Sequence, residues 1–170
     1  MPLSAASYIV NVRQRTCGAG PSASSFSLST RISKPPGSKC ARIFDSARRL
    51  SKDDLLLVLV SGGGSSLLSL PVESISMADL KAVTKELLRC GAIIQEINTV
   101  RKHLSLIQGG RLASACKAKI LALVISDVTG DDPTHIASGP CAPDPTTYQD
   151  ALDILTRYEC KIPAAVQTTL

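Results

Sequence analysis

Aromatic side chains and long hydrophobic runs are both scarce in this sequence of 170 residues. Only 3% of the residues are aromatic, and none is Trp. Modules that bind single-stranded nucleic acid stack bases on aromatic rings, so we expect no nucleic-acid partner. No apolar run exceeds six residues, the length of 55–60, whereas a transmembrane helix needs about 20. We therefore expect no membrane span. A hydrophobic content of 44% still allows an ordinary core.

The cysteines lack the spacing of a metal site, because no C-x-x-C pair occurs. No apolar secretory segment opens the chain, so a disulfide framework is not expected either. We expect reduced and mostly buried thiols. The six cysteines are Cys17, Cys40, Cys90, Cys116, Cys141 and Cys160.

The N-terminal region is basic and has almost no acidic residues. Residues 1–52 hold nine Lys or Arg against Asp45 alone, a net charge of +8. Since the whole chain carries +5, the remainder is net negative, and the basic charge does not mark a nucleic-acid-binding face on the folded part. Residues 1–40 contain nine Ser and no sustained apolar periodicity, so we expect a disordered or targeting leader. Its composition fits a mitochondrial transit peptide and an arbitrary leader equally well. We accordingly expect a cytoplasmic protein, or a mitochondrial one if the leader targets it.

From residue 41 onward, helical and strand patterns alternate. Two stretches are apolar at every position, 55–60 and 120–125, as in strands covered on both faces of a parallel sheet. Ser76 and Thr147 are each followed three residues later by Asp, which is typical of a helix N-terminus. Apolar residues at helical spacing predict helices over 41–50, 77–90, 94–104, 111–118 and 148–158.

This alternation predicts an α/β domain over 41–170, with a three-layer architecture. We expect a mostly parallel sheet with right-handed crossovers and helices on both faces, as in part of a Rossmann-like domain. In such sheets ligands bind at the carboxyl ends of the strands. The polar loops 61–66 and 126–132 each follow an apolar strand directly, so they are expected along the same rim.

The first candidate site is the glycine loop, Ser61-Gly62-Gly63-Gly64-Ser65-Ser66. Consecutive glycines allow positive φ and let main-chain N–H groups turn toward an anion, which no Cβ then blocks. The Ser hydroxyls add donors, and a following helical turn would add its dipole. The loop matches neither a Walker A motif nor G-x-G-x-x-G. A sharp strand exit that binds nothing is the alternative.

Acidic and basic residues elsewhere supply further candidates. Asp127, just past the second strand, is placed to accept a proton from a substrate hydroxyl or to hold Mg²⁺. Asp131 and Asp132 are weaker candidates, since solvated loop acids or caps explain them as well. Arg101 and Lys102 offer charge for a phosphate or carboxylate, the alternative being a solvated helix face. Further candidates are Asn98 and, in a polar loop, Ser138 and Gly139. A Ser hydrolase is disfavoured because G-x-S-x-G does not occur.

Four motifs in this order resemble the glycerate 2-kinases of the MOFRL type, over residues 41–170. They are Leu57-Val58-Leu59-Val60-Ser61-Gly62-Gly63-Gly64-Ser65-Ser66-Leu67-Leu68, Glu96-Ile97-Asn98-Thr99-Val100-Arg101-Lys102-His103-Leu104-Ser105, Ile125-Ser126-Asp127-Val128-Thr129-Gly130-Asp131-Asp132-Pro133, and Ile136-Ala137-Ser138-Gly139-Pro140 with Pro143-Asp144-Pro145-Thr146. The resemblance implies transfer of the ATP γ-phosphoryl group, with Mg²⁺, to the 2-hydroxyl of D-glycerate. The resemblance does not decide whether the protein assembles into a homo-oligomer.

The resemblance also implies roles for particular residues. The glycine loop would bind phosphate, Arg101 and Lys102 would neutralise charge, and Asp127 would be the acid beside the reacting centre and a Mg²⁺ ligand. Three departures stand against it. Gln108 replaces a Lys usual in the family, the family's N-terminal catalytic segment has no counterpart in 1–40, and the MOFRL domain is absent. We therefore expect an incomplete kinase. The alternative is an inactive fragment that binds nucleotide or a partner without catalysis.

Overall fold

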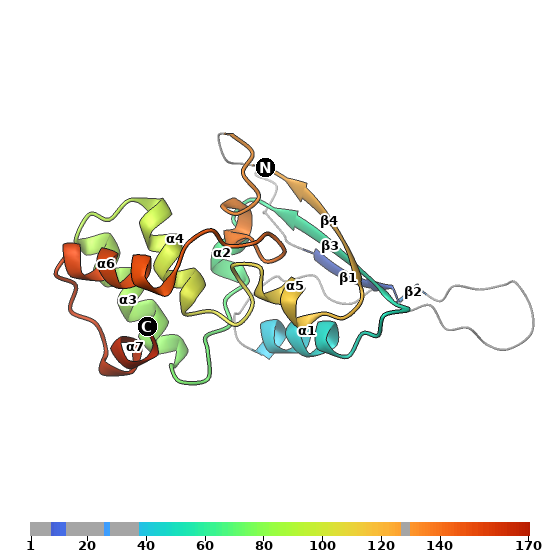
Figure 1. The fold of residues 1–170 in the computed structure, drawn as a ribbon, viewed down its shortest axis with the longest axis horizontal. Coiled ribbons are helices and arrows are strands. Elements are labelled where there is room, and N and C mark those ends of the chain that lie inside the picture. The colour runs from blue at the N-terminus through green and yellow to red at the C-terminus, as the bar shows by residue number, and fades with distance from the viewer. Residues whose placement is uncertain (1–7, 13–25, 28–37, 127–129) are drawn as a thin grey trace, which may run out of the picture.

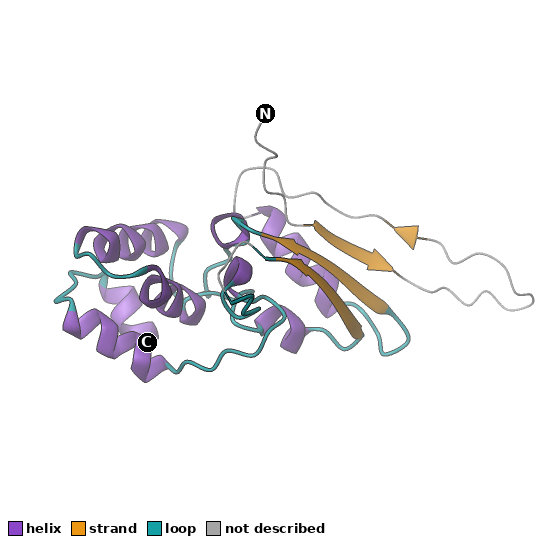
Figure 2. Cartoon of the chain, turned by 90° about the horizontal axis from the view of Figure 1, so that it is seen from above, coloured by secondary structure: helices purple, strands orange, loops and turns teal. Residues whose placement is uncertain are grey.

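The computed structural model describes residues 8–12, 26–27, 38–126 and 130–170, and Figures 1 and 2 show their arrangement. A group of helices lies on one side of Figure 1 and a sheet with two further helices on the other. We call these parts the helical lobe (α3, α4, α6 and α7) and the sheet lobe (β1–β4, α1 and α5). Among the helices described, none is long and apolar enough to cross a membrane.

The sheet has the strand order β2-β1-β3-β4. The strands are β1 (Tyr8–Val12), β2 (Phe26–Ser27), β3 (Leu55–Ser61) and β4 (Lys119–Ile125). The two strands predicted from their apolar runs, β3 and β4, pair in parallel, with Ser61 opposite Ile125. β1 pairs antiparallel with both β2 and β3. The α/β class is confirmed, and the described part of the sheet is mixed.

Two short strands, β1 and β2, lie within residues 1–40, for which we predict a disordered or targeting leader. Residues 8–12 read Tyr-Ile-Val-Asn-Val, a run rich in the β-branched and aromatic residues that favour strands. β1 pairs along β3 from Val12 opposite Leu55 to Tyr8 opposite Leu59, so the backbone groups on that side of β3 are paired rather than left as an open edge. The bias toward Ser and Arg in residues 1–40 concealed this short segment.

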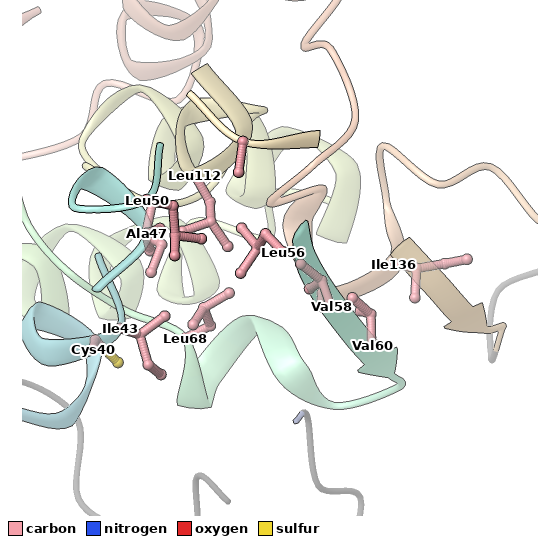
Figure 3. Close-up of a cluster of buried hydrophobic side chains, with 13 residues drawn as sticks. Cys40, Ile43, Ala47, Leu50, Leu56, Val58, Val60, Leu68, Leu112 and Ile136 are labelled. Carbon is pink, nitrogen blue, oxygen red and sulfur yellow. The ribbon is translucent and has the colours of Figure 1, made fainter. Parts of the chain in front are cut away.

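The core of the sheet lobe packs against one face of β3 (Figure 3). Leu56, Val58 and Val60 alternate along the strand and are buried. Helices α1 (Ser38–Arg48) and α5 (Arg111–Ala115) cover this face with Ile43, Ala47 and Leu112 among others. The outer face of β4 is different, because Leu123 is 52% exposed and Ile125 is 74% exposed. The described residues thus form one helical layer on the sheet, and the expected second layer is not among them.

The helical lobe has a separate core built from amphipathic helices. These are α3 (Met77–Arg89), α4 (Ile94–His103), α6 (Tyr148–Arg157) and α7 (Ala164–Thr169). The predicted capping boxes are confirmed, with Ser76 and Asp79 at the start of α3 and Thr147 and Asp150 at the start of α6. Each pair satisfies two backbone N–H groups that the helix leaves unpaired. α7, a helix of six residues after Pro163, was not predicted from the sequence.

Candidate functional site

The glycine loop leaves the sheet where β3 ends. Gly63 has a φ of 73°, in the left-handed region that glycine adopts at little cost, and the short helix α2 (Gly64–Leu67) begins directly after it. Because β3 and β4 are parallel and in register, the loops that follow them leave at the same rim, as predicted. α2 is only four residues long, so its dipole adds little at the loop. Asp127 lies outside the described residues.

Ser65 is the point where three distant segments meet. Its carbonyl oxygen accepts a hydrogen bond from Arg101 Nη2 at 2.7 Å and another from Gln108 Nε2 at 2.8 Å. Its hydroxyl oxygen accepts a hydrogen bond from Ser138 Oγ at 2.9 Å. Gln108 Nε2 also donates to the carbonyl of Leu68 at 2.9 Å. The end of the glycine loop is therefore held by side chains from α4, from the segment after it and from the turn at Ser138.

That turn has an unusual backbone. It lies at the one-turn 3₁₀ helix η1 (Ile136–Ser138), where Ala137, Ser138 and Gly139 all have positive φ, between 52° and 59°. A non-glycine residue in this conformation costs about 1–2 kcal/mol, so surrounding contacts must hold it. The N–H of Gly109 donates to Ser138 O at 2.9 Å, and that of Gly110 donates to Gly139 O at 2.7 Å. The turn is thus locked to the paired glycines after α4.

Lys102 is buried rather than on a solvated helix face. The side chain is 2% exposed, and its Nζ donates to Asp144 Oδ1 at 2.6 Å. Thr146 also donates to this carboxylate, from its N–H at 3.1 Å and its hydroxyl at 2.7 Å. Burial by itself would raise the pKa of Asp144, but the hydrogen bonds from Lys102 and Thr146 outweigh it and hold that pKa below its usual value. The Lys102 charge is therefore balanced within the protein.

Arg101, the residue before Lys102, has no such partner in the described part of the chain. Among the described residues, no carboxylate lies within ion-pair distance of its guanidinium, and its hydrogen bond goes to the neutral carbonyl of Ser65. Burial lowers the pKa of Arg101 because the charged form loses solvation. Of the two adjacent cations that the sequence put forward, Arg101 is the one whose charge no described carboxylate balances, and it lies beside the glycine loop.

The remaining candidates make local contacts or none. Asp132 accepts a hydrogen bond from the N–H of Thr134 at 2.8 Å, which lowers its pKa, and so acts as a cap in this loop. Asp131 is exposed and has a φ of 53°. Asn98 is buried on α4, and its Oδ1 has no hydrogen-bond partner among the described residues. The structure therefore unites the glycine loop with Arg101 and Ser138, but not with these three.

Two residues that organise the site were not among the predicted site residues. Gln108 is 2% exposed and holds Ser65, although the sequence analysis noted it only as the loss of a family cation. In the sequence, Gln108 stands out only as a polar residue between two apolar residues and the glycine pair Gly109-Gly110. Asp144 lies in the fourth motif of the family resemblance, but its role could not be predicted because its partner Lys102 is 42 residues away in the chain.

Comparison with known proteins fits this arrangement. The family model described as "Domain of unknown function (DUF4147)" matches residues 37–170. The chain belongs to this family. A glycerate 2-kinase of Pyrococcus horikoshii is 50% identical over 121 residues, which cover 70% of this chain and 28% of that protein. The D-glycerate 2-kinase of Thermotoga maritima is 46% identical over 130 residues, covering 76% and 31%.

Other similar proteins agree in fold and differ in name. A protein of Agrobacterium vitis that is 53% identical over 130 residues is provisionally named a hydroxypyruvate reductase, and the match covers 76% of this chain and 34% of that protein. The crystal structure of the Thermotoga maritima glycerate kinase superposes with a TM-score of 0.72 at 46% identity, covering 76% of this chain and 32% of that one. The present DUF4147 chain thus spans about a third of the length of the relatives it matches. The predicted resemblance to glycerate 2-kinases is confirmed at the level of the family.

Proposed function

We propose that this DUF4147 chain carries the phosphate-binding half of a kinase that transfers the γ-phosphoryl group of ATP to the 2-hydroxyl of D-glycerate. The observation that carries the proposal is the convergence on Ser65. A loop that binds a polyphosphate must be rigid before the ligand arrives, because phosphoryl transfer is catalysed by positioning and electrostatics. Hydrogen bonds from Arg101, Gln108 and Ser138 supply that rigidity.

In this proposal the residues of the site have separate tasks. Main-chain N–H groups of 61–66 donate to phosphate oxygens, and the charge of Arg101 offsets the negative charge on the transferring group. Lys102, already paired with Asp144, positions α4 rather than touching phosphate. Ser138 and Gly139 hold the loop. Asn98, Asp131 and Asp132 remain candidates for contacts with glycerate.

Asp127 is proposed as the general base: its carboxylate accepts the proton of the 2-hydroxyl as that oxygen bonds to the γ-phosphorus, while the bond from the γ-phosphorus to the β,γ-bridging oxygen breaks and ADP leaves. Replacing Asp127 by Asn is expected to abolish turnover and leave nucleotide binding largely intact. Mg²⁺, expected for ATP chemistry, would neutralise phosphate charge when bound. The described residues contain no group of three His, Cys, Asp or Glu side chains able to hold a metal ion.

The test is ATP-dependent formation of 2-phosphoglycerate from D-glycerate by the purified chain. We expect Arg101→Gln to lower kcat at least about 100-fold, as removal of a group that stabilises transition-state charge does. Arg42→Gln, a change at an exposed position on α1, is the matched control and should leave turnover unchanged. Turnover of ATP that does not depend on glycerate would contradict the substrate assignment.

An inactive nucleotide-binding fragment is the alternative, since a third of the relatives' length need not form a whole cleft. Calorimetric titration with ATP and Mg²⁺ separates these cases, because the fragment binds nucleotide without turnover. We do not propose a hydroxypyruvate reductase, since the loop lacks the G-x-G-x-x-G pattern of dinucleotide sites. Location in the cytoplasm or mitochondrion and assembly as a homo-oligomer stay predictions.

A further inference from the structure

A cavity of about 340 Å³ lies against α3, beside the glycine loop. One side is a single stripe of α3, with Leu80, Thr84 and Leu88 at helical spacing. Ser66 and Ser69 line it from the loop end, and Arg101 lines it from α4. Ligand pockets occupy about 300–1,000 Å³, so this cavity has room for a nucleoside but not for much more.

The charged side chains that line the cavity are all cations. Lys81 and Lys85 stand one turn apart on α3, and Arg101 faces them from α4, while no carboxylate is part of the lining. The Arg101 guanidinium is partly buried and has no ion-pair partner among the described residues, although its neighbour Lys102 is fully paired. A desolvated and unbalanced cation is costly to keep, which points to an anion that balances it.

The lining also has an apolar part, which comes from α3. Met77, Leu80 and Leu88 belong to it, and Leu88 is 61% exposed. A Met thioether makes favourable contacts with aromatic rings, and Leu packs against their faces. Apolar and cationic groups together select a ligand with a flat ring at one end and negative charge at the other.

We propose that the α3 cavity binds the nucleoside end of a nucleoside triphosphate. The heterocycle lies against Met77, Leu80 and Leu88, and the phosphates run past Arg101 toward Ser66 and the glycine loop. Lys81 and Lys85 flank this path from α3. The inference rests on the proposed function, because it assumes that the polyphosphate ends at residues 61–66. It adds the ring-binding surface, which that proposal leaves open.

The test is calorimetric titration of the full 170-residue chain with ATP, with adenosine and with tripolyphosphate. The double variant Lys81→Glu/Lys85→Glu is expected to bind ATP at least about tenfold more weakly. Its matched control is Lys117→Glu/Lys119→Glu, which makes the same charge change at exposed positions outside the cavity lining and should change the affinity less than twofold. Leu88→Asn should weaken adenosine and ATP but leave tripolyphosphate unaffected. The four lysines and Leu88 are all exposed, so the variants should fold and give unchanged circular dichroism spectra.

A further variant separates this inference from the proposed function. Gly62→Val adds a side chain in the loop and should weaken ATP and tripolyphosphate alike. If Gly62→Val abolishes ATP binding while the Lys and Leu88 variants bind as tightly as the wild type, the cavity assignment is overturned and the phosphate loop stands. If the wild-type chain binds none of the three ligands, both proposals fall. Equal weakening of ATP by the two double variants would mean a general charge effect, which also overturns the cavity assignment.

Discussion

The helical lobe and the sheet lobe differ in how completely they bury their apolar side chains. In the helical lobe, α3, α4, α6 and α7 enclose one core, and paired caps satisfy the starts of α3 and α6. In the sheet lobe, one face of β3 is buried beneath helices, while Leu121, Leu123 and Ile125 of β4 remain in solvent. Exposed apolar strands are unusual on a self-contained surface. The helical lobe is closed by its own residues, and the sheet lobe leaves apolar surface open.

The glycine loop lies at the junction of these two parts. Ser65 follows β3 of the sheet lobe, and Arg101 belongs to α4 of the helical lobe. Lys102, also on α4, is tied to Asp144 in the segment that leads to α6. The proposed site therefore depends on the contact between the lobes, and the experiments below separate the stability of each lobe from that of the junction.

The largest effect is expected from Asp144→Ala at the junction. This change leaves the buried ammonium of Lys102 without its partner, which costs about 3–5 kcal/mol when one half of a buried pair is removed. Urea denaturation monitored by circular dichroism measures the loss. Lys102→Met combined with Asp144→Leu should regain most of it, since two apolar groups leave no charge unpaired. A double variant as unstable as the single one would argue against the ion pair as the cause.

The same pair predicts a pH dependence. Because the pKa of Asp144 is lowered in the folded protein, its contribution to stability is complete above the unfolded-state value of about 3.9. That contribution is lost as the pH falls through the lower folded-state pKa. In the Asp144→Asn variant, the free energy of unfolding should therefore fall less steeply as the pH drops below about 4. The residual acid dependence should come from the other described carboxyl groups whose pKa values are lowered by hydrogen bonds, which are Asp79, Glu86, Glu96, Asp132 and Asp150.

Truncation of a buried side chain in either lobe should show whether the two lobes unfold separately. Leu87→Ala in the helical lobe and Leu56→Ala in the sheet lobe each empty a fully buried position, which costs about 2–5 kcal/mol. Hydrogen exchange measured peptide by peptide should show the loss of protection chiefly in the lobe that carries the change. Uniform loss across both lobes for both variants would mean that they unfold as one unit, and the comparison would then fail.

Removing a helix cap should have a smaller effect, confined to the helical lobe. Ser76→Ala deletes the hydroxyl that accepts from the N–H of Asp79 and is expected to cost about 1 kcal/mol. Thermal denaturation detects a change of this size. Ser76→Asn is the matched control and should retain most of the stability, because Asn also caps well. An unchanged Tm for Ser76→Ala would show that the capping box of Ser76 and Asp79 does not stabilise α3.

The smallest change in stability is expected on the open face of β4. Leu123→Lys replaces a side chain that is 52% exposed, so the free energy of unfolding should change by less than about 0.5 kcal/mol. Self-association, measured by analytical ultracentrifugation, should fall because an apolar patch is broken. Leu56→Lys, on the buried face of the neighbouring strand, is the contrast and should prevent folding. A large loss from Leu123→Lys would mean that this face is covered.

Much of the fold was predictable because its signals are local. Continuous apolar runs predicted β3 and β4, and the Ser-x-x-Asp and Thr-x-x-Asp patterns predicted the starts of α3 and α6. The positive φ of Ala137 and Ser138 was beyond such reasoning, because nothing in the side chains favours it. β1 was missed for a related reason, since a five-residue strand inside a polar segment becomes stable only through its pairing with β3.

For the candidate site, the residue types along the chain indicate the available chemistry: a triple-glycine bend, adjacent cations and acids placed after strands. Which of the two adjacent cations is paired with a carboxylate depends on how distant segments pack together. Lys102 and Arg101 are neighbours of the same charge, yet within the part of the chain that the structure describes only Lys102 pairs with a carboxylate, which lies 42 residues away in the sequence. Ion pairing depends on distances of a few ångströms between side chains from distant segments, and a linear pattern does not encode them. Hence the types of residue could be read from the chain, while the division between a structural and a chemically available cation came from packing.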